Sequence, residues 1–287
     1  MRHLSRPLPR PVFQLLRAMR EPRRLARLHY SSVLAGLHSL LEGEEAAALR
    51  KHFEIDAQRF AELEHALVSD TAFTRAVESA YSSVRECDIR LLGSTPAEDH
   101  EAGLRMLYYL TRLLEPARVV ETGVFDGFSS AFILKALRDN GHGHLYSIDF
   151  PARRPVDAST NQMFFDCLPT GHHPGWLVPQ PLRDRWTLRL GTSQTLLEGL
   201  LKECGEIDLF FHDSLHTHET MLWEYQTAWP RISDGGLLVS DDVFWSRAFW
   251  SFAANSGREH TIHSGLGVVR KPEATVPRTA FAGRQAA

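Results

Sequence analysis

Three aspartates that follow two apolar runs are the residues of this chain best suited to bind a metal ion. Asp213 follows the run Ile207–His212, and Asp241 and Asp242 follow the run 236–240. Such runs are typical of buried parallel strands, whose carboxyl ends meet at one edge of a sheet. A single aspartate there often serves a turn, but three would repel one another and raise their pKa values. A hard divalent cation such as Mg²⁺ relieves that repulsion, so we expect these three to be metal ligands.

A histidine close to these acids is suited to proton transfer. His216 lies three residues after Asp213. Because the imidazole titrates near neutral pH, it can act as a general base toward a hydroxyl group beside a metal ion. His218 is the competing candidate for this role. Strand alternation directs the neighbouring His212 elsewhere.

The stretch from Val119 to Ser130 predicts a strand, a glycine-rich turn and the start of a helix. Gly123 and Gly127 allow the backbone to turn and to approach a ligand closely. Such a unit commonly binds a nucleotide or nucleoside. Three residues separate the glycines, unlike the GxGxxG pattern that clamps a pyrophosphate. A dehydrogenase is therefore the weaker alternative, and a cofactor with ribose but no pyrophosphate, such as S-adenosylmethionine, is favoured.

Two further segments are expected to complete the cofactor site. Asp149 ends the next strand, where an acidic residue typically accepts hydrogen bonds from ribose hydroxyls. Gly191, Ser193 and Gln194 begin a helix after the following strand, where N–H groups and side chains can contact the base. Simple capping of that helix by Thr192 or Ser193 is the alternative, and the two roles are compatible.

These residues depend on strands and helices that alternate from residue 118 onward. The alternation predicts an α/β fold with a doubly wound, mostly parallel sheet and right-handed crossovers. The expected strands are Arg118–Thr122, His144–Asp149, Trp186–Leu190, Ile207–His212, 236–240, His260–His263 and Leu266–Arg270. The expected helices are 46–66, 71–84, one that begins with a capping box at Thr95 and ends near Pro116, 129–140, 193–203, 218–229 and 244–254.

The late start of this alternation divides the chain into three parts. Residues 1–92 are expected to form a basic arm and a helical extension, residues 93–271 the cofactor-binding domain, and residues 272–287 a tail. The segment 151–185 interrupts the alternation, and its length is typical of a lid or binding loop. Within it, His172, His173 and Trp176 are candidates for contact with a substrate by location alone.

The composition excludes several classes of protein. A net charge of −3 gives no electrostatic reason to expect nucleic acid as a partner. Three widely spaced cysteines, Cys87, Cys167 and Cys204, predict neither a disulfide framework nor a zinc site. No apolar run reaches the roughly 18 residues of a membrane span, so we expect a soluble cytoplasmic protein.

The first 28 residues differ from the rest of the chain, because they hold eight arginines and Glu21 as the sole acid. Such an arm is suited to weak contact with an anionic membrane surface or with nucleic acid. Since it lacks a clean apolar face, a solvated leader is the favoured interpretation.

At these motifs the chain resembles the class I S-adenosylmethionine-dependent methyltransferases, nearest to the metal-dependent catechol, caffeoyl-CoA and macrolide-sugar O-methyltransferases. The resemblance covers about residues 95–271. It implies a seven-stranded Rossmann-like sheet, S-adenosylmethionine as cofactor, and Mg²⁺ or another divalent cation on Asp213, Asp241 and Asp242. The residues that it places at the cofactor are Glu121, Thr122, Gly123, Asp126, Gly127, Ser129, Asp149, Gly191, Ser193, Gln194 and Asp213.

Two departures from the catechol enzymes bear on the acceptor. Those enzymes carry a lysine where this chain has His216, and a tryptophan against adenine where it has Leu215. The sugar-methylating relatives use histidine as the base. The resemblance therefore implies an O-methyltransferase that acts on a hydroxyl of a small molecule, a sugar, glycoside or phenol. The alternative is a protein of this fold that binds without catalysis and is tethered through its basic arm.

Overall fold

The computed structural model describes residues 53, 55–86, 97–150, 168, 171–256, 260–263 and 265–273 of the 287-residue chain. Several expected features lie outside these residues. They are the basic arm 1–28, the first part of the helix expected at 46–66, the capping residues Thr95 and Pro96, most of the segment 151–170, the tail from residue 274, and the cysteines Cys87 and Cys167.

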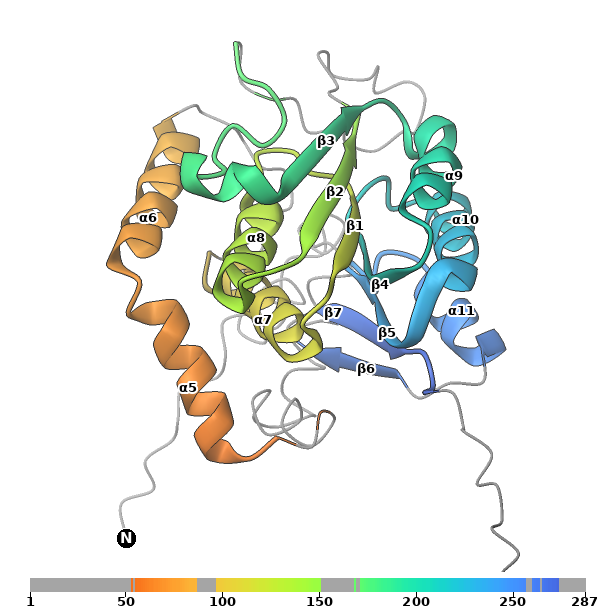
Figure 1. Cartoon of the computed structure of the whole chain (residues 1–287). Helices are drawn as coiled ribbons and strands as arrows, with labels where there is room; N and C mark the ends of the chain where they lie inside the picture. Colours follow the sequence, from red (N-terminus) through yellow and green to blue (C-terminus); the bar gives the residue numbers. More distant parts are fainter. Residues whose placement is uncertain are drawn as a thin grey trace, which may run out of the picture.

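A seven-stranded sheet forms the centre of the fold, with the strand order 3-2-1-4-5-7-6 (Figure 1). The first five strands are parallel, whereas β7 runs antiparallel to β5 and β6. This confirms the predicted α/β class, and the order differs from the 3-2-1-4-5-6 order of dinucleotide-binding sheets. The strands are β1 (Arg118–Thr122), β2 (His144–Asp149), β3 (Trp186–Leu190), β4 (Ile207–His212), β5 (Ile232–Ser240), β6 (His260–His263) and β7 (Leu266–Arg270).

Helices cover both faces of this sheet (Figure 1). Alternate residues of β4 enter different cores, since Leu209 and Phe211 join one apolar cluster and Phe210 joins the other. One face carries α5 (Ala57–Val68), α6 (Thr71–Glu86), α7 (Ala97–Leu114), α8 (Phe128–Asn140) and the 3₁₀ helix η2 (Gln180–Arg185). The other carries α9 (Ser193–Cys204), α10 (His218–Ala228), η3 (Trp229–Arg231) and α11 (Ala248–Ser256). None of the helices in the described ranges is long and apolar enough to span a bilayer.

Four expectations for these elements are wrong. The helix expected at 46–66 begins only at Ala57 within the described residues, because the side chain of Asp56 accepts the N–H of Arg59 at 2.7 Å and caps α5 there. The strand β5 begins at Ile232 because a register shift opposite β4 and a left-handed Gly235 (φ 81°) let the chain continue through an irregularity. The helix α11 begins only at Ala248, since the carbonyl of Asp242 accepts the N–H of Trp245 at 2.9 Å in a turn before it. Residues 180–185 form η2, although a loop was expected there.

A buried ammonium group joins the N-terminal helices to α8. The side chain of Lys135 is 2% exposed and lies against the carboxylate of Asp139, with Asp70 at 3.5 Å. Asp139 also accepts the hydroxyl of Tyr108 in α7 at 2.8 Å, and Asp70 pairs with Arg138. This charge cluster therefore connects α7, α8 and the turn between α5 and α6.

We expect Asp139→Ala to lower the free energy of unfolding by about 3 kcal/mol, because it removes one partner of a buried charge. Lys135→Met should cost much less, since a flexible apolar side chain then fills the same space. Urea unfolding followed by circular dichroism measures both changes. The control Glu203→Ala alters the exposed pair with Arg189 and should have little effect. Equal losses for Asp139→Ala and Lys135→Met would contradict this account.

Candidate functional site

The predicted site residues meet at the carboxyl edge of the sheet. Gly123, Gly191, Asp213 and Asp241 are the first residues after β1, β3, β4 and β5. Each donates its backbone N–H at 2.8 Å to a carbonyl near the end of the neighbouring strand. These four bonds extend the parallel ladder beyond the strands and hold the following loops in register.

The glycine-rich loop after β1 is tightly confined on two sides. Gly123 has a φ of +86°, and a Cβ atom added there would lie 1.9 Å from the carbonyl oxygen of Asp213. Gly127 has a φ of +100°, and its added Cβ would lie 2.7 Å from a methyl group of Val178 and 2.8 Å from the Cα of Gly175. Only glycine fits both positions, because L side chains are strained at these φ values.

Glu121 lies behind this loop with its side chain fully buried. Its carboxylate accepts hydrogen bonds from the hydroxyls of Ser129 (2.8 Å), Ser130 (2.7 Å) and Ser147 (2.6 Å). Burial raises the pKa of Glu121 to about 7, although the three hydroxyls act in the opposite direction. The carboxylate thus connects β1 to α8 and β2. The role predicted for Glu121 at the cofactor would therefore be indirect, through the conformation of the glycine-rich loop.

Asp149, at the end of β2, holds the same loop from its other side. One carboxylate oxygen, Oδ2, accepts the N–H groups of Val124 at 2.7 Å and Phe125 at 2.6 Å. Burial raises the pKa of Asp149 above its ordinary value even though these two bonds lower it. The apolar side chains of Phe150 and Leu190 next to it are 57% and 56% exposed. An apolar surface is therefore exposed to solvent at the ends of β2 and β3.

A segment that the sequence marked only by location covers the glycine-rich loop. Gly175 and Leu177 donate their N–H groups to the carbonyls of Phe125 (2.8 Å) and Asp126 (3.0 Å). The ring of Trp176 meets the ring of His172 edge-on at 4.0 Å, and its buried Nε1 has no hydrogen-bond partner. The segment 171–178 is therefore a wall of the candidate site.

The start of α9 forms a third side. Thr192 is the N-cap residue, but its side chain makes no capping hydrogen bond, so capping does not explain its presence. Ser193 is buried, and the amide of Gln194 lies 3.5 Å from the hydroxyl of Thr220 in α10. Both predicted base-contacting side chains thus lie between α9 and α10.

The acidic residues and His216 come together at the ends of β4 and β5. The imidazole of His216 lies between two carboxylates, with Nε2 3.5 Å from Asp213 Oδ1 and Nδ1 3.5 Å from Asp242 Oδ2. Burial raises the pKa of Asp213 well above its ordinary value, and the charges of Asp241 and Asp242 raise it further. His218 lies exposed at the first turn of α10. The expected crowding of negative charge is present.

The fit of this edge to a cation can be judged from its donors. Carboxylate oxygens are the ligands that hard divalent cations prefer, and the repulsion at Asp213 would be relieved by one. In the part of the chain that the structure describes, however, no three acidic, histidine or cysteine side chains form a ready-made metal site. Asp242 has a left-handed φ of 48°, and the charges of Asp241 and Asp242 both act on Asp213.

Sequence reasoning missed a buried acid behind these residues. Glu224 of α10 accepts hydrogen bonds from His212 Nδ1 at 2.6 Å and from the hydroxyls of Thr122 at 2.5 Å and Ser214 at 2.7 Å. A signal was available, because Glu224 immediately precedes Tyr225 on the apolar face of an amphipathic helix. A charged residue at such a position is rarely buried without a partner.

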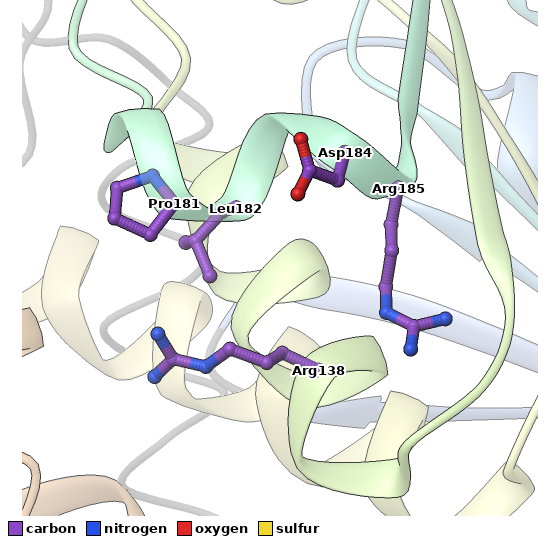
Figure 2. A pocket seen from close by; sticks show the side chains of 5 residues that line it. All are labelled: Arg138, Pro181, Leu182, Asp184 and Arg185. Atoms are coloured by element: carbon purple, nitrogen blue, oxygen red, sulfur yellow. The ribbon is translucent and has the colours of Figure 1, made fainter.

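A hollow of about 410 Å³ lies elsewhere, between the end of α8 and η2 (Figure 2). Its two guanidinium groups already have partners, since Arg138 pairs with Asp70 and Arg185 donates to the carbonyls of Gly141 and Gly143. The hollow lies at the end of α8 opposite the glycine-rich loop, so it takes no part in the candidate site.

Comparison with known proteins agrees with this geometry. A family model described as a methyltransferase domain matches residues 120–243, which include the strand ends from Glu121 to Asp242. No curated protein matches the chain in sequence. The crystal structure of cofactor-bound Rv0187 from MTB aligns with 74% of this chain and 95% of its own, at 18% identity and a TM-score of 0.50. The domain match shows a methyltransferase domain over residues 120–243, and the strand order of the sheet agrees with it.

Two further solved structures are similar at lower TM-scores. An O-methyltransferase from Bacillus cereus in complex with SAH is 14% identical, with 70% of this chain and 91% of that chain covered and a TM-score of 0.45. The O-methyltransferase TomG from Streptomyces achromogenes in complex with SAM is 17% identical, with coverages of 69% and 89% and a TM-score of 0.47.

The raised pKa of Glu121 predicts a stability change with pH. Its pKa is about 7 in the folded chain against an ordinary 4.5, so the folded state binds more protons between these values. Stability should therefore fall as pH rises from 4.5 to 7, by about 3 kcal/mol from this group. Glu121→Gln should remove this slope.

Urea unfolding of both proteins from pH 4.5 to 7.5 measures the difference. Asp149 and Asp213 are common to both proteins, and the difference between the curves therefore reports Glu121 together with its charge coupling to these two acids. Parallel curves for the two proteins would contradict the raised pKa of Glu121.

Proposed function

We propose that this chain is an S-adenosylmethionine-dependent O-methyltransferase that acts on a hydroxyl of a small molecule. In this proposal Mg²⁺ or another divalent cation is held by Asp213, Asp241 and Asp242, and His216 is the general base. The observation that carries the proposal is the position of His216 between Asp213 and Asp242, at the same sheet edge as the glycine-rich loop.

The cofactor would lie across the ends of β1, β2 and β3. Asp149 uses one oxygen for the loop amides, and its other oxygen is available for ribose hydroxyls. Three of the four exposed large apolar side chains of the described residues, Phe150, Leu190 and Leu215, lie around this edge and would cover the adenine ring. The methionine part would lie against Gly123 and Gly127, where the surplus of acids suits its positive sulfonium.

The remaining cofactor assignments follow the same placement. Ser193 and Gln194, with Gly191, would contact the base from the start of α9. Glu121, Thr122, Asp126 and Ser129 would shape the glycine-rich loop. Rv0187, which has the same fold, is itself cofactor-bound.

The reaction joins two bound molecules, so positioning should supply much of its rate. A lone pair of the acceptor oxygen attacks the methyl carbon, and the carbon–sulfur bond breaks with its electron pair returning to sulfur. A ring nitrogen of His216 takes the hydroxyl proton. When bound, a divalent cation would lower the pKa of that hydroxyl.

The acceptor would lie next to His216, on the side remote from the glycine-rich loop. The ring of Trp245, in the turn after β5, is 6.2 Å from the ring of His216, and the segment 171–178 stands beside the glycine-rich loop. A histidine base favours an alcohol or sugar hydroxyl. Mass spectrometry of the protein with S-adenosylmethionine, Mg²⁺ and a panel of sugars, glycosides and phenols tests the proposal, and a methylated product is the expected result.

Removal of the metal should abolish turnover without preventing cofactor binding. We expect excess EDTA, or Asp241→Asn, to reduce product formation at least 100-fold, because the acceptor hydroxyl is then no longer held as an anion. The affinity for S-adenosylhomocysteine, measured by calorimetry, should change only a few-fold. Asp234→Asn, at the opposite end of β5, is the matched control and should be fully active. Undiminished activity in excess EDTA would remove the metal from the proposal.

The choice of base can be tested with two matched variants. His216→Gln should lower kcat by roughly 100-fold or more, the size of a general-base contribution, with little change in cofactor affinity. His218→Gln should keep kcat within a few-fold. If His218→Gln is the inactive variant, the base has been assigned to the wrong histidine.

A further inference from the structure

We propose that Glu224, through His212, is a positioning residue that holds the cofactor loop and the acidic strand end in one fixed arrangement. This inference rests on the proposed function and deepens it. Neither Glu224 nor His212 is among the residues that the sequence placed at the cofactor, the metal ion or the base. Both side chains are fully buried, so neither can contact a ligand directly.

The partners of Glu224 come from three segments that border the site: the end of β1, the end of β4 with the loop after it, and the start of α9. Thr122 is the last residue of β1, His212 is the last residue of β4, and Ser214 follows Asp213. The hydroxyl of Ser193, at the start of α9, also hydrogen-bonds to this carboxylate. A single group on α10 thus restrains the residues next to the glycine-rich loop, the metal candidate and the base-contacting helix.

The burial of this pair argues against a role in stability alone. The side chains of Glu224, His212 and Thr122 are all fully buried. Burial alone would raise the pKa of Glu224, but the charge and hydrogen bond of His212 lower it below its ordinary value. A buried pair of ionisable side chains seldom stabilises a fold more than apolar side chains of similar volume. The geometry that the pair imposes is therefore the better reason for its presence.

His212 transmits this restraint toward the proposed base. Its ring meets the ring of His216 edge-on at 5.5 Å and the ring of Tyr225 edge-on at 5.3 Å. The bond to Glu224 fixes one nitrogen of His212, while its buried Nε2 has no hydrogen-bond partner. The orientation of the ring consequently depends on Glu224.

Two variants separate positioning from stability. Glu224→Gln should weaken the binding of S-adenosylhomocysteine about 10-fold, the lower end for partners of ligand-contacting groups. The double variant Glu224→Leu with His212→Phe leaves no unpaired buried charge, so its thermal stability should recover in part, while the buried hydroxyls of Thr122 and Ser193, which lose their acceptor, keep it below wild type. Its affinity for S-adenosylhomocysteine should stay reduced, because the restraint on Thr122 and Ser214 is still absent.

The measurements are calorimetric titration with S-adenosylhomocysteine and thermal unfolding of each protein. Asp139→Asn, in the charge cluster on the opposite face of the sheet, is the control that should lower stability without a loss of affinity. Ser214→Ala removes one partner only and serves if Glu224→Gln does not fold; a weaker binding of two-fold or more is then expected.

The outcomes distinguish the inference from the proposed function. Wild-type affinity in Glu224→Gln, or recovery of affinity together with stability in the double variant, would overturn the positioning role and leave the proposed function standing. A wild-type protein that does not bind S-adenosylhomocysteine would overturn both. Reduced affinity in both variants, with partly recovered stability in the double variant, is the supporting result.

Discussion

The structure depends on the accommodation of negative charge at one edge of a sheet. Carboxylates that are taken out of water must each find hydrogen bonds or an opposite charge, because an unpaired buried carboxylate is costly. This chain places acids at the ends of β1, β2, β4 and β5 and adds Glu224 behind them. Each deeply buried carboxylate accepts hydrogen bonds from a different kind of donor: hydroxyls for Glu121, backbone amides for Asp149 and an imidazole for Glu224. The loops of the site are the elements that supply those donors.

The alternation of side chains along β1 explains how Glu121 and Glu224 can both be hydrogen-bonded next to the same strand. Glu121 points to the face covered by α8 and meets serines there, whereas Thr122 points to the face covered by α10 and meets Glu224. The glycine-rich loop begins at the next residue. It is therefore anchored from both faces of the sheet, and Asp149 holds its amides from the neighbouring strand. A loop restrained in this way is pre-organised for a ligand that needs its backbone.

The sequence predicted the elements that follow from periodicity and the residues that follow from strand ends. Six of the seven strands have the expected bounds, since apolar runs bounded by Gly, Asp or Pro leave little freedom. The start of α11 was wrong because a turn at Asp242 with a positive φ has no signal in the composition of 244–254. The Glu224 cluster was missed for a different reason: its donor Thr122 lies 102 residues before Glu224, and no local pattern brings Thr122 to α10. The contact of 175–177 with the glycine-rich loop is long-range in the same sense.

The acids at the ends of β4 and β5 differ in their surroundings from the buried acids of the scaffold. Glu121, Asp149 and Glu224 each accept two or more short hydrogen bonds within the protein, and each supports a loop. Asp213 instead faces Asp241 and Asp242, whose charges raise its pKa, and His216 approaches it and Asp242 only at 3.5 Å. These side chains are only partly buried, since Asp213 is 31% and Asp242 is 40% exposed, so solvent and ligands can reach them. Under the proposed function, this concentration of negative charge would bind two cations, the sulfonium of the cofactor and a metal ion.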